Sequence, residues 1–253
     1  MFLMSAVLNE GLEELGECPG DVNSTFCKTR LKRVVLPSTL RVIGGYTFYC
    51  CRYLRSVEFR EGSRLERIGR EAFYDCQNLR SISLPEGLRL IESKCFFHNG
   101  LEEITIPSSI TTLGDYAFCL CYDLKRVIFQ SGSKLEQIGN DCFSSNGLEE
   151  FVAPPGLRRI GSGAFSSCSD MILAVLNEGL EKIGDQCKGS YCSGAFGGIG
   201  VKEITLPSTL KQIDQHTFKN CKSLRTIYVR NGCRADLSQL IVPASAQVVR
   251  LSD

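Results

Sequence analysis

The segment LKRVVLPSTLRVIGGYTFYCCRY, residues 31–53, decides the fold, because it recurs along the chain. Residues 201–223 read VKEITLPSTLKQIDQHTFKNCKS, and residues 101–123 read LEEITIPSSITTLGDYAFCLCYD. A repeat of this length indicates a solenoid, in which each unit covers the apolar face of its neighbour. We number the repeats as coils one to ten, which start near residues 3, 31, 54, 79, 101, 124, 148, 171, 201 and 224.

Each coil opens with alternating apolar and polar residues, as at Val34 and Leu36 or Ile204 and Leu206. This alternation predicts a half-buried strand. A proline often follows, and then a second short apolar pair such as Leu40 and Ile43. We therefore expect parallel strands starting near residues 32, 55, 80, 102, 125, 149, 172, 202 and 225.

Nine coils also place one phenylalanine at a fixed position beyond the second apolar pair. The nine are Phe26, Phe48, Phe73, Phe96, Phe118, Phe143, Phe165, Phe196 and Phe218. A stacked aromatic spine follows, since one coil cannot bury its own apolar face. Ten coils at a strand spacing of about 4.7 to 4.9 Å would form one slab about 45 to 50 Å long.

We expect residues 1–253 to form a single domain. The segment AVLNEGLE occurs at residues 6–13 and again at 174–181, so coils one to three recur as coils eight to ten. Residues 234–253 lose the phenylalanine step, and we interpret them as a degenerate terminal repeat or a cap.

The pattern x-L-P-x-x-L-x-x-I-G-x-x-A-F-x-x-C resembles the BspA-like class of leucine-rich repeats, found in bacterial and protist surface proteins. The resemblance covers about residues 3 to 233. It implies a right-handed leucine-rich-repeat superhelix of about ten coils, with parallel β-strands on one face and short strands and helical turns on the other. It also implies binding to other macromolecules, although such families do not share one partner.

The composition favours no particular electrostatic partner, because 29 Lys and Arg balance 28 Asp and Glu. We expect no nucleic-acid partner, since the one basic stripe is short and lacks interleaved aromatic residues. We also expect no membrane insertion, because no stretch approaches the about 18 to 20 apolar residues of a membrane span. Residues 1–15 do not resemble a signal peptide. The location would be cytoplasmic if the chain is complete, while a fragment is compatible with the cell surface.

Fourteen cysteines make the chain cysteine-rich, and five share the position three residues after the spine phenylalanine. These are Cys51, Cys76, Cys121, Cys168 and Cys221. Coils four and six carry Asn99 and Asn146 there, with Cys95 and Cys142 moved to the residue before the phenylalanine. We predict buried, reduced thiols that fill space near the turns. Cys18 with Cys27 and Cys187 with Cys192 could be disulfides, parts of a zinc site or free thiols.

The sequence argues against an enzyme. It has two histidines, His98 and His216, and lacks a phosphate loop, a triad signature and a metal motif. Cys95 beside His98 could suggest a nucleophile and base, but we interpret both as structural. We therefore predict no catalytic residue, no cofactor and no metal.

The outward strand positions carry the candidate binding residues. Ile172, Leu173 and Val175 form an apolar patch on coil eight, with Ile128 and Val152 nearby. Arg33, Arg55 and Arg80 form a basic stripe on coils two to four, offset on the strands only by Glu58; Tyr228 is a further candidate. Two other interpretations remain. Charges on coils five to seven could neutralise one another across the strands, and the insertion at residues 185–194 could cover the patch.

These features predict a non-catalytic binding module whose strand face recognises a protein or other macromolecule, as in adhesion or scaffolding. A rigid, extended surface loses little entropy on binding. The alternative is a structural protein that stacks end to end through exposed strand edges.

Overall fold

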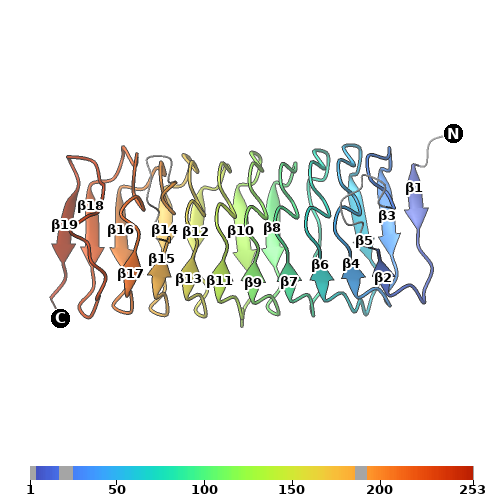
Figure 1. Ribbon diagram of the computed structural model, residues 1–253, viewed down its shortest axis with the longest axis horizontal. Helices are drawn as coiled ribbons and strands as arrows, with labels where there is room; N and C mark the ends of the chain where they lie inside the picture. Colours follow the sequence, from blue (N-terminus) through green and yellow to red (C-terminus); the bar gives the residue numbers. More distant parts are fainter. Residues whose placement is uncertain (1–3, 17–24, 186–192, 253) are drawn as a thin grey trace.

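The computed structural model describes residues 4–16, 25–185 and 193–252. The coils lie side by side in one elongated row, with the two termini at opposite ends (Figure 1). Two rows of parallel strands run along this solenoid, and a column of turns joins them. The predicted parallel β-solenoid is therefore confirmed.

The longer strands form what we call the strand face. They are β1 (Ser5–Val7), β3 (Arg33–Leu36), β5 (Ser56–Phe59), β8 (Glu103–Ile106), β10 (Arg126–Phe129), β12 (Glu150–Val152), β14 (Leu173–Val175), β16 (Glu203–Leu206), β18 (Thr226–Val229) and β19 (Gln247–Arg250). All the pairs are parallel, and each strand begins within one residue of its predicted start where one was predicted. Alternation of buried and exposed side chains thus located these strands correctly.

The strand expected near residue 80 is absent, and this prediction was wrong. Ile82 is buried as a strand residue would be, but residues 81–84 make no backbone hydrogen bond to a neighbouring coil in the described part of the chain. A ladder requires the amides and carbonyls of adjacent coils to lie opposite one another. Burial of Ile82 fixes which side chains face inward but not this alignment, so the alternating pattern alone predicted a strand that does not form.

The second row is a continuous sheet with one short strand per coil, which we call the short-strand face. It comprises β2 (Glu14–Leu15), β4 (Val42–Ile43), β6 (Arg67–Ile68), β7 (Leu90–Ile91), β9 (Thr112–Leu113), β11 (Gln137–Ile138), β13 (Arg159–Ile160), β15 (Lys182–Ile183) and β17 (Gln212–Ile213). These nine strands correspond to about nine turns of the solenoid. The glycine after several of them is required by close packing, since a Cβ on Gly114 would lie 2.6 Å from backbone atoms of coil four.

The predicted helical turns are wrong, because no helix occurs among the described residues. Alternate amides of the turns instead bond to the next coil, as Phe48 N does to Ala72 O at 2.8 Å, and those between them bond within the turn, as Tyr49 N does to Tyr46 O at 3.1 Å. The residues two before and two after the spine phenylalanine have positive φ, as Tyr46 at 60° and Cys50 at 54° do. A backbone that reverses φ and bonds every second amide to the next coil cannot continue the i→i−4 bonds of an α-helix.

The phenylalanine spine is confirmed. Consecutive rings from Phe26 to Phe218 stack with centroids 5.0 to 6.2 Å apart and interplanar angles of 1° to 14°. Leucine and isoleucine side chains from both strand rows pack around them and form one core. The stacking explains why the coil cannot be stable alone: each ring depends on two neighbours.

The five ladder cysteines are buried and free, as predicted. Space-filling is an incomplete account of them, however. Each thiol donates a hydrogen bond to the carbonyl of the previous spine phenylalanine, for example Cys51 to Phe26 at 2.8 Å and Cys221 to Phe196 at 2.9 Å. In coil four the Asn99 amide makes the same bond to Phe73 O at 2.7 Å. Cys18, Cys187 and Cys192 lie outside the described residues.

The duplicated AVLNEGLE segment keeps its contacts in both copies. Glu10 accepts hydrogen bonds from Ser38 N at 3.2 Å and Arg60 Nη1 at 2.7 Å. Glu178 accepts one from Ser208 N at 3.0 Å and pairs with Arg230 Nε at 3.0 Å. At the other end of the array, β19 pairs in parallel with β18 and adds a further strand after residues 234–246.

Candidate binding surface on the strand face

The apolar candidates lie together and are exposed. Ile172, Leu173 and Val175 belong to coil eight, and β14 pairs with β12 so that Val175 lies beside Val152. Ile128 is on the adjacent strand β10. Ile172 has an exposed fraction of 76%, and Leu173 one of 46%. We call these five residues the apolar patch.

The insertion of coil eight begins and ends away from this patch. Asp185 follows β15, on the short-strand side, and its amide bonds Ser162 Oγ at 2.9 Å. At the other end of the insertion, Ser193 is described again and leads into the turn that carries Phe196. The side chains of the patch are exposed, so the patch is an accessible surface of the described chain.

Charged residues surround the patch on the same face. The register places Glu150 beside Leu173, and Glu203 follows on the next strand, β16. Glu149 and Glu150 form no ion pair within the described residues, whereas Glu103 pairs with Arg126 at 2.5 Å. The predicted mutual neutralisation of coils five to seven therefore holds between coils five and six and does not extend to coil seven.

The basic stripe is less basic than the sequence suggested. Arg33 makes a two-pronged contact with Glu58, with Nε to Oε1 at 2.7 Å and Nη2 to Oε2 at 2.6 Å. Arg80 pairs with Glu102 of the next coil. Glu58 is thus not the only offsetting carboxylate, and that expectation was wrong. Of the three arginines, Arg55 alone has no ion pair within the described chain.

Tyr228 lies apart from the apolar patch. It is half-buried on β18, where the register places it between Thr205 and Val249. Coil nine separates it from Val175. The structure therefore brings five of the candidates together and leaves the arginines and Tyr228 elsewhere on the strand face.

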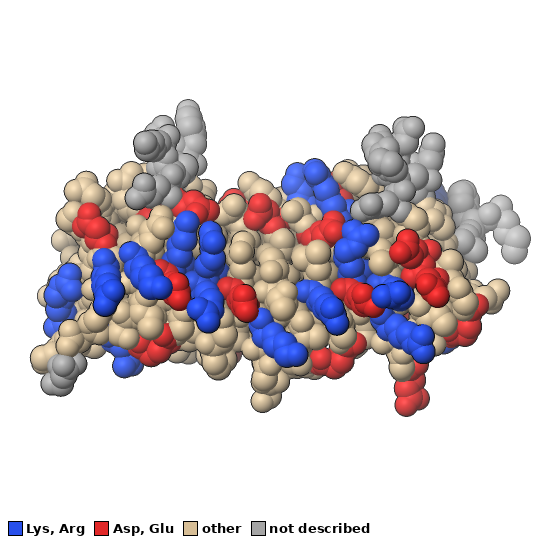
Figure 2. Space-filling view, turned by 60° about the horizontal axis from the view of Figure 1, so that its bottom comes forward, with Lys and Arg blue, Asp and Glu red and all other residues tan. Residues whose placement is uncertain are grey.

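The short-strand face is occupied by charges that pair with one another. Figure 2 shows Lys and Arg interleaved with Asp and Glu along the length of the molecule. Arg41 contacts Glu66 at 2.8 Å, and Glu181 lies between Arg158 at 3.2 Å and Lys211 at 2.8 Å. Exposed pairs of this kind contribute little to stability. They do satisfy one another, so this face offers few uncompensated groups to a partner.

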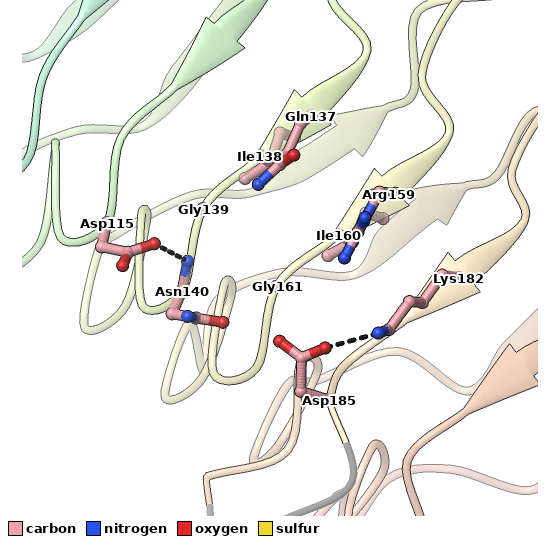
Figure 3. A pocket seen from close by; sticks show the side chains of 10 residues that line it. All are labelled: Asp115, Gln137, Ile138, Gly139, Asn140, Arg159, Ile160, Gly161, Lys182 and Asp185. Carbon is pink, nitrogen blue, oxygen red and sulfur yellow. Dashed lines mark hydrogen bonds and ion pairs between the residues drawn. The ribbon is translucent and has the colours of Figure 1, made fainter.

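Two pockets of the described chain differ in size and lining. The cavity in Figure 3, which contains Asp115, Asn140 and Lys182 in its lining, has a volume of about 40 Å³. Small-molecule sites occupy about 300 to 1,000 Å³. A wider groove of about 420 Å³ near Ser63 is lined by three arginines and three glutamates, which leaves it without net charge. Within the described residues, no His, Cys, Asp and Glu side chains cluster to hold a metal.

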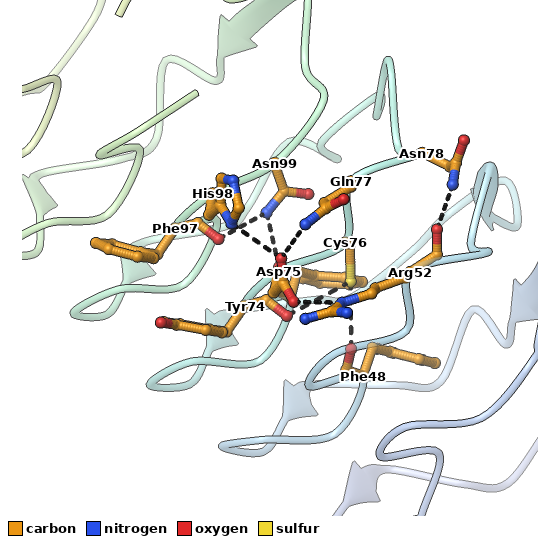
Figure 4. Close-up of polar contacts among 11 residues, drawn as sticks. Phe48, Arg52, Tyr74, Asp75, Cys76, Gln77, Asn78, Phe97, His98 and Asn99 are labelled. Carbon is orange, nitrogen blue, oxygen red and sulfur yellow. Dashed lines mark hydrogen bonds and ion pairs between the residues drawn. The ribbon is translucent and has the colours of Figure 1, made fainter. Parts of the chain in front are cut away.

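Cys95 and His98 do not form a nucleophile and base. Cys95 is fully buried, and burial raises the pKa of its thiol well above the ordinary value. The His98 ring points to the buried Asp75, with Nδ1 3.0 Å from Oδ1, while Arg52 Nε contacts Oδ2 at 2.6 Å (Figure 4). A protonated buried thiol is a weak nucleophile, and the histidine is held by a different partner.

The tyrosines of the turns were not among the candidates predicted from the sequence. Six of the eight tyrosines fall between residues 46 and 122, on the turn side of coils two to five. Tyr53, Tyr116 and Tyr122 are exposed there. Their uneven distribution along a repeating chain was visible in the sequence and could have identified them.

The alternating strands and stacked turns agree with a comparison of the sequence with known families. The BspA type leucine-rich repeat region matches in six copies over residues 22–132, 89–193 and 175–238. The chain belongs to this family. No curated protein sequence matches it. Among the described residues of this BspA-type protein, no helix is long and apolar enough to cross a membrane.

Solved structures show the same fold. A leucine-rich repeat protein of Bacteroides ovatus is 22% identical, with a TM-score of 0.71 over 98% of this chain and 71% of the other. A leucine rich cell surface protein of Faecalibacterium prausnitzii is 21% identical, with a TM-score of 0.65 over 100% of this chain and 70% of the other. At these identities the likeness extends to the fold of the BspA-type chain alone.

Proposed function

We propose that this BspA-type protein is a non-catalytic binding module that recognises a protein partner through the apolar patch of its strand face. The observation that carries the proposal is the exposure of five apolar side chains on three adjacent strands. Contiguous exposed apolar area on a soluble surface is typical of an interface. The rigid coils would lose little entropy on binding, because the strands are already ordered.

The patch has the character of an interface centre. Binding energy concentrates in a few large side chains that become fully desolvated, with polar residues at the rim. Ile172 and Leu173 would supply the anchors, and Glu149, Glu150 and Glu203 would lie at the rim. Arg55 could extend the contact along the strand face toward coil three.

The test compares two carboxylate substitutions on the same face. Leu173→Glu places a charge in the patch, and Val7→Glu places one at an exposed position on β1, seven coils away. A partner captured from the native source should bind the Val7→Glu variant as tightly as it binds the parent. Its free energy of binding to the Leu173→Glu variant should be weaker by about 2 kcal/mol or more. Equal binding of both variants, with equal melting temperatures, would exclude the patch.

End-to-end assembly is the second candidate. In the described chain β19 is paired on one side only, and Val248 and Leu251 near it are exposed. An unpaired strand edge can accept a strand of another molecule. Sedimentation that stays that of a monomer over a wide concentration range would rule out this role, whereas growth in length would favour it.

A further inference from the structure

A second, independent surface lies on the turn side of coils two to five. Tyr49 stacks on Tyr74 with centroids 4.8 Å apart and planes at 15°, and Tyr74 stacks on Phe97 at 4.8 Å and 7°. Tyr53, Tyr116 and Tyr122 are exposed on the turns of coils two and five. We call these six residues the tyrosine edge. Ser144 and Ser166 occupy the position of the stacked rings in coils six and seven, so the feature is local.

Several ring faces of the tyrosine edge are already covered. Tyr74 has a ring on both sides, the Arg30 guanidinium lies 5.8 Å from the Tyr53 centroid, and Lys94 Nζ lies 5.8 Å from the Tyr116 centroid. His98 meets Tyr122 edge to face at 6.1 Å. Tyr122 and Tyr53 keep exposed fractions of 61% and 49%, whereas the Tyr116 phenol already hydrogen-bonds the Asp141 carboxylate. The surface therefore offers the phenols of Tyr53 and Tyr122 as hydrogen-bond donors.

The ion pairs beneath these rings point their positive ends outward. The Arg52 side chain is 62% exposed, whereas its partner Asp75 is 6% exposed. Arg70 and Glu71 repeat the arrangement, at 57% and 10%. Figure 4 shows Asp75 enclosed by Arg52, Gln77 and His98. The pairs are formally neutral, but a partner would meet guanidinium groups first and carboxylates behind them.

We propose that the tyrosine edge binds an acidic protein segment. Carboxylates of the segment would accept hydrogen bonds from the phenols of Tyr53 and Tyr122. They would also pair with Arg52, Arg70, Lys94 and Lys28, whose amide bonds Tyr49 O at 2.8 Å. Stacking holds the rings in place before binding, which lowers the entropy lost on association. Single-stranded nucleic acid fits less well, because its bases need open aromatic faces. Tyr74 has a ring on both sides, and a cation lies near the rings of Tyr53 and Tyr116.

The test uses a labelled oligoglutamate peptide and an oligothymidylate of matched charge as probes, at low ionic strength. Three double variants are compared with the parent. Lys28→Gln with Lys94→Gln removes two cations of the edge, and Tyr53→Phe with Tyr122→Phe removes two hydroxyls and keeps the rings. The control, Lys134→Gln with Lys222→Gln, removes two exposed cations elsewhere; Lys222 lies at the equivalent turn of coil nine, which has no tyrosine.

The peptide should bind the parent and the control equally and should bind each edge variant about fivefold more weakly. Equal weakening in the control would show attraction by overall charge and overturn the proposal. So would undetectable peptide binding, or tighter binding of the oligothymidylate than of the peptide. Melting temperatures of the three variants establish that each remains folded.

Discussion

Replacing the thiol of Cys121 should reveal whether the cysteine ladder fills space or forms hydrogen bonds. Its Sγ donates to Phe96 O at 3.1 Å, and Phe96 O has no other hydrogen-bond donor among the described residues. Burial raises the pKa of Cys121 to about 12, so the group remains a protonated donor near neutral pH. Two substitutions separate the explanations, because serine keeps a donor and alanine does not.

The magnitudes follow from the local environment. Cys121→Ala leaves a buried carbonyl without a partner, which costs about 1 to 3 kcal/mol, and removes about one methylene of apolar volume, about 1 kcal/mol. Cys121→Ser loses the volume and keeps the bond. We therefore expect the free energy of unfolding to fall in the order parent, Ser variant, Ala variant. Pure space-filling predicts the opposite order for the two variants, since a buried hydroxyl without a partner is costly.

Cys95 supplies the matched control. It is equally buried, but it occupies a position where other coils carry Ala72, Ala117 and Ala164. Here alanine should be tolerated better than serine. Urea unfolding followed by circular dichroism, with reductant present, measures all four variants. If Cys121→Ala is at least as stable as Cys121→Ser, the hydrogen-bond explanation is refuted.

Three further outcomes are expected. Gly100→Ala would place a Cβ 2.2 Å from Gln77 O and should lower stability by about 1 to 3 kcal/mol in urea unfolding; an unchanged midpoint would contradict this. Phe118→Ala interrupts the spine and should lower the free energy of unfolding by about 3 to 5 kcal/mol. A loss of only about 1 kcal/mol would argue against ring stacking as the main support of the fold. The hydrogen bond from Arg33 lowers the pKa of Glu58 to about 2. The stabilisation from ionised Glu58 is present above the ordinary pKa of 4.5 and is lost as the pH falls toward 2. The melting temperature of Glu58→Gln should therefore depend less on pH over that range than that of the parent. Parallel profiles of melting temperature against pH would contradict this contribution of Glu58.

The repeat made the inward half of the structure predictable. A position that recurs with the same apolar type, such as Phe48 and Phe73, must be buried in every coil, so burial follows from the sequence alone, as does the position of the longer strand except in coil four. The hydrogen bonds between coils could not be predicted from the sequence. Spacing shows that Cys51 is buried, but the carbonyl that it meets depends on how the turn of one coil stacks on the next. The helical turns were wrong for the same reason, because the amides bond between coils.

The outward half was predictable only in part. Exposure of Leu173 followed from alternation, since Ala174, the next residue on β14, faces inward. The ion-pair partner of Arg80 could not be predicted, because the strand expected there is missing and the pairing with Glu102 depends on the actual path of coil four. A charge on a repeat surface therefore cannot be counted as available until the register of the adjacent coil is known.

In a solenoid, departures from the repeat at outward positions cost little stability, so they are the positions where binding can differ between coils. Two such departures occur here, and they face different directions. The apolar patch lies on the strands of coils six to eight, and the tyrosine edge lies on the turns of coils two to five. No side chain belongs to both. We therefore expect Leu173→Glu to leave the affinity for the acidic peptide unchanged, and Tyr53→Phe with Tyr122→Phe to leave strand-face binding unchanged. Loss of both activities in either variant would mean that the two surfaces form one site.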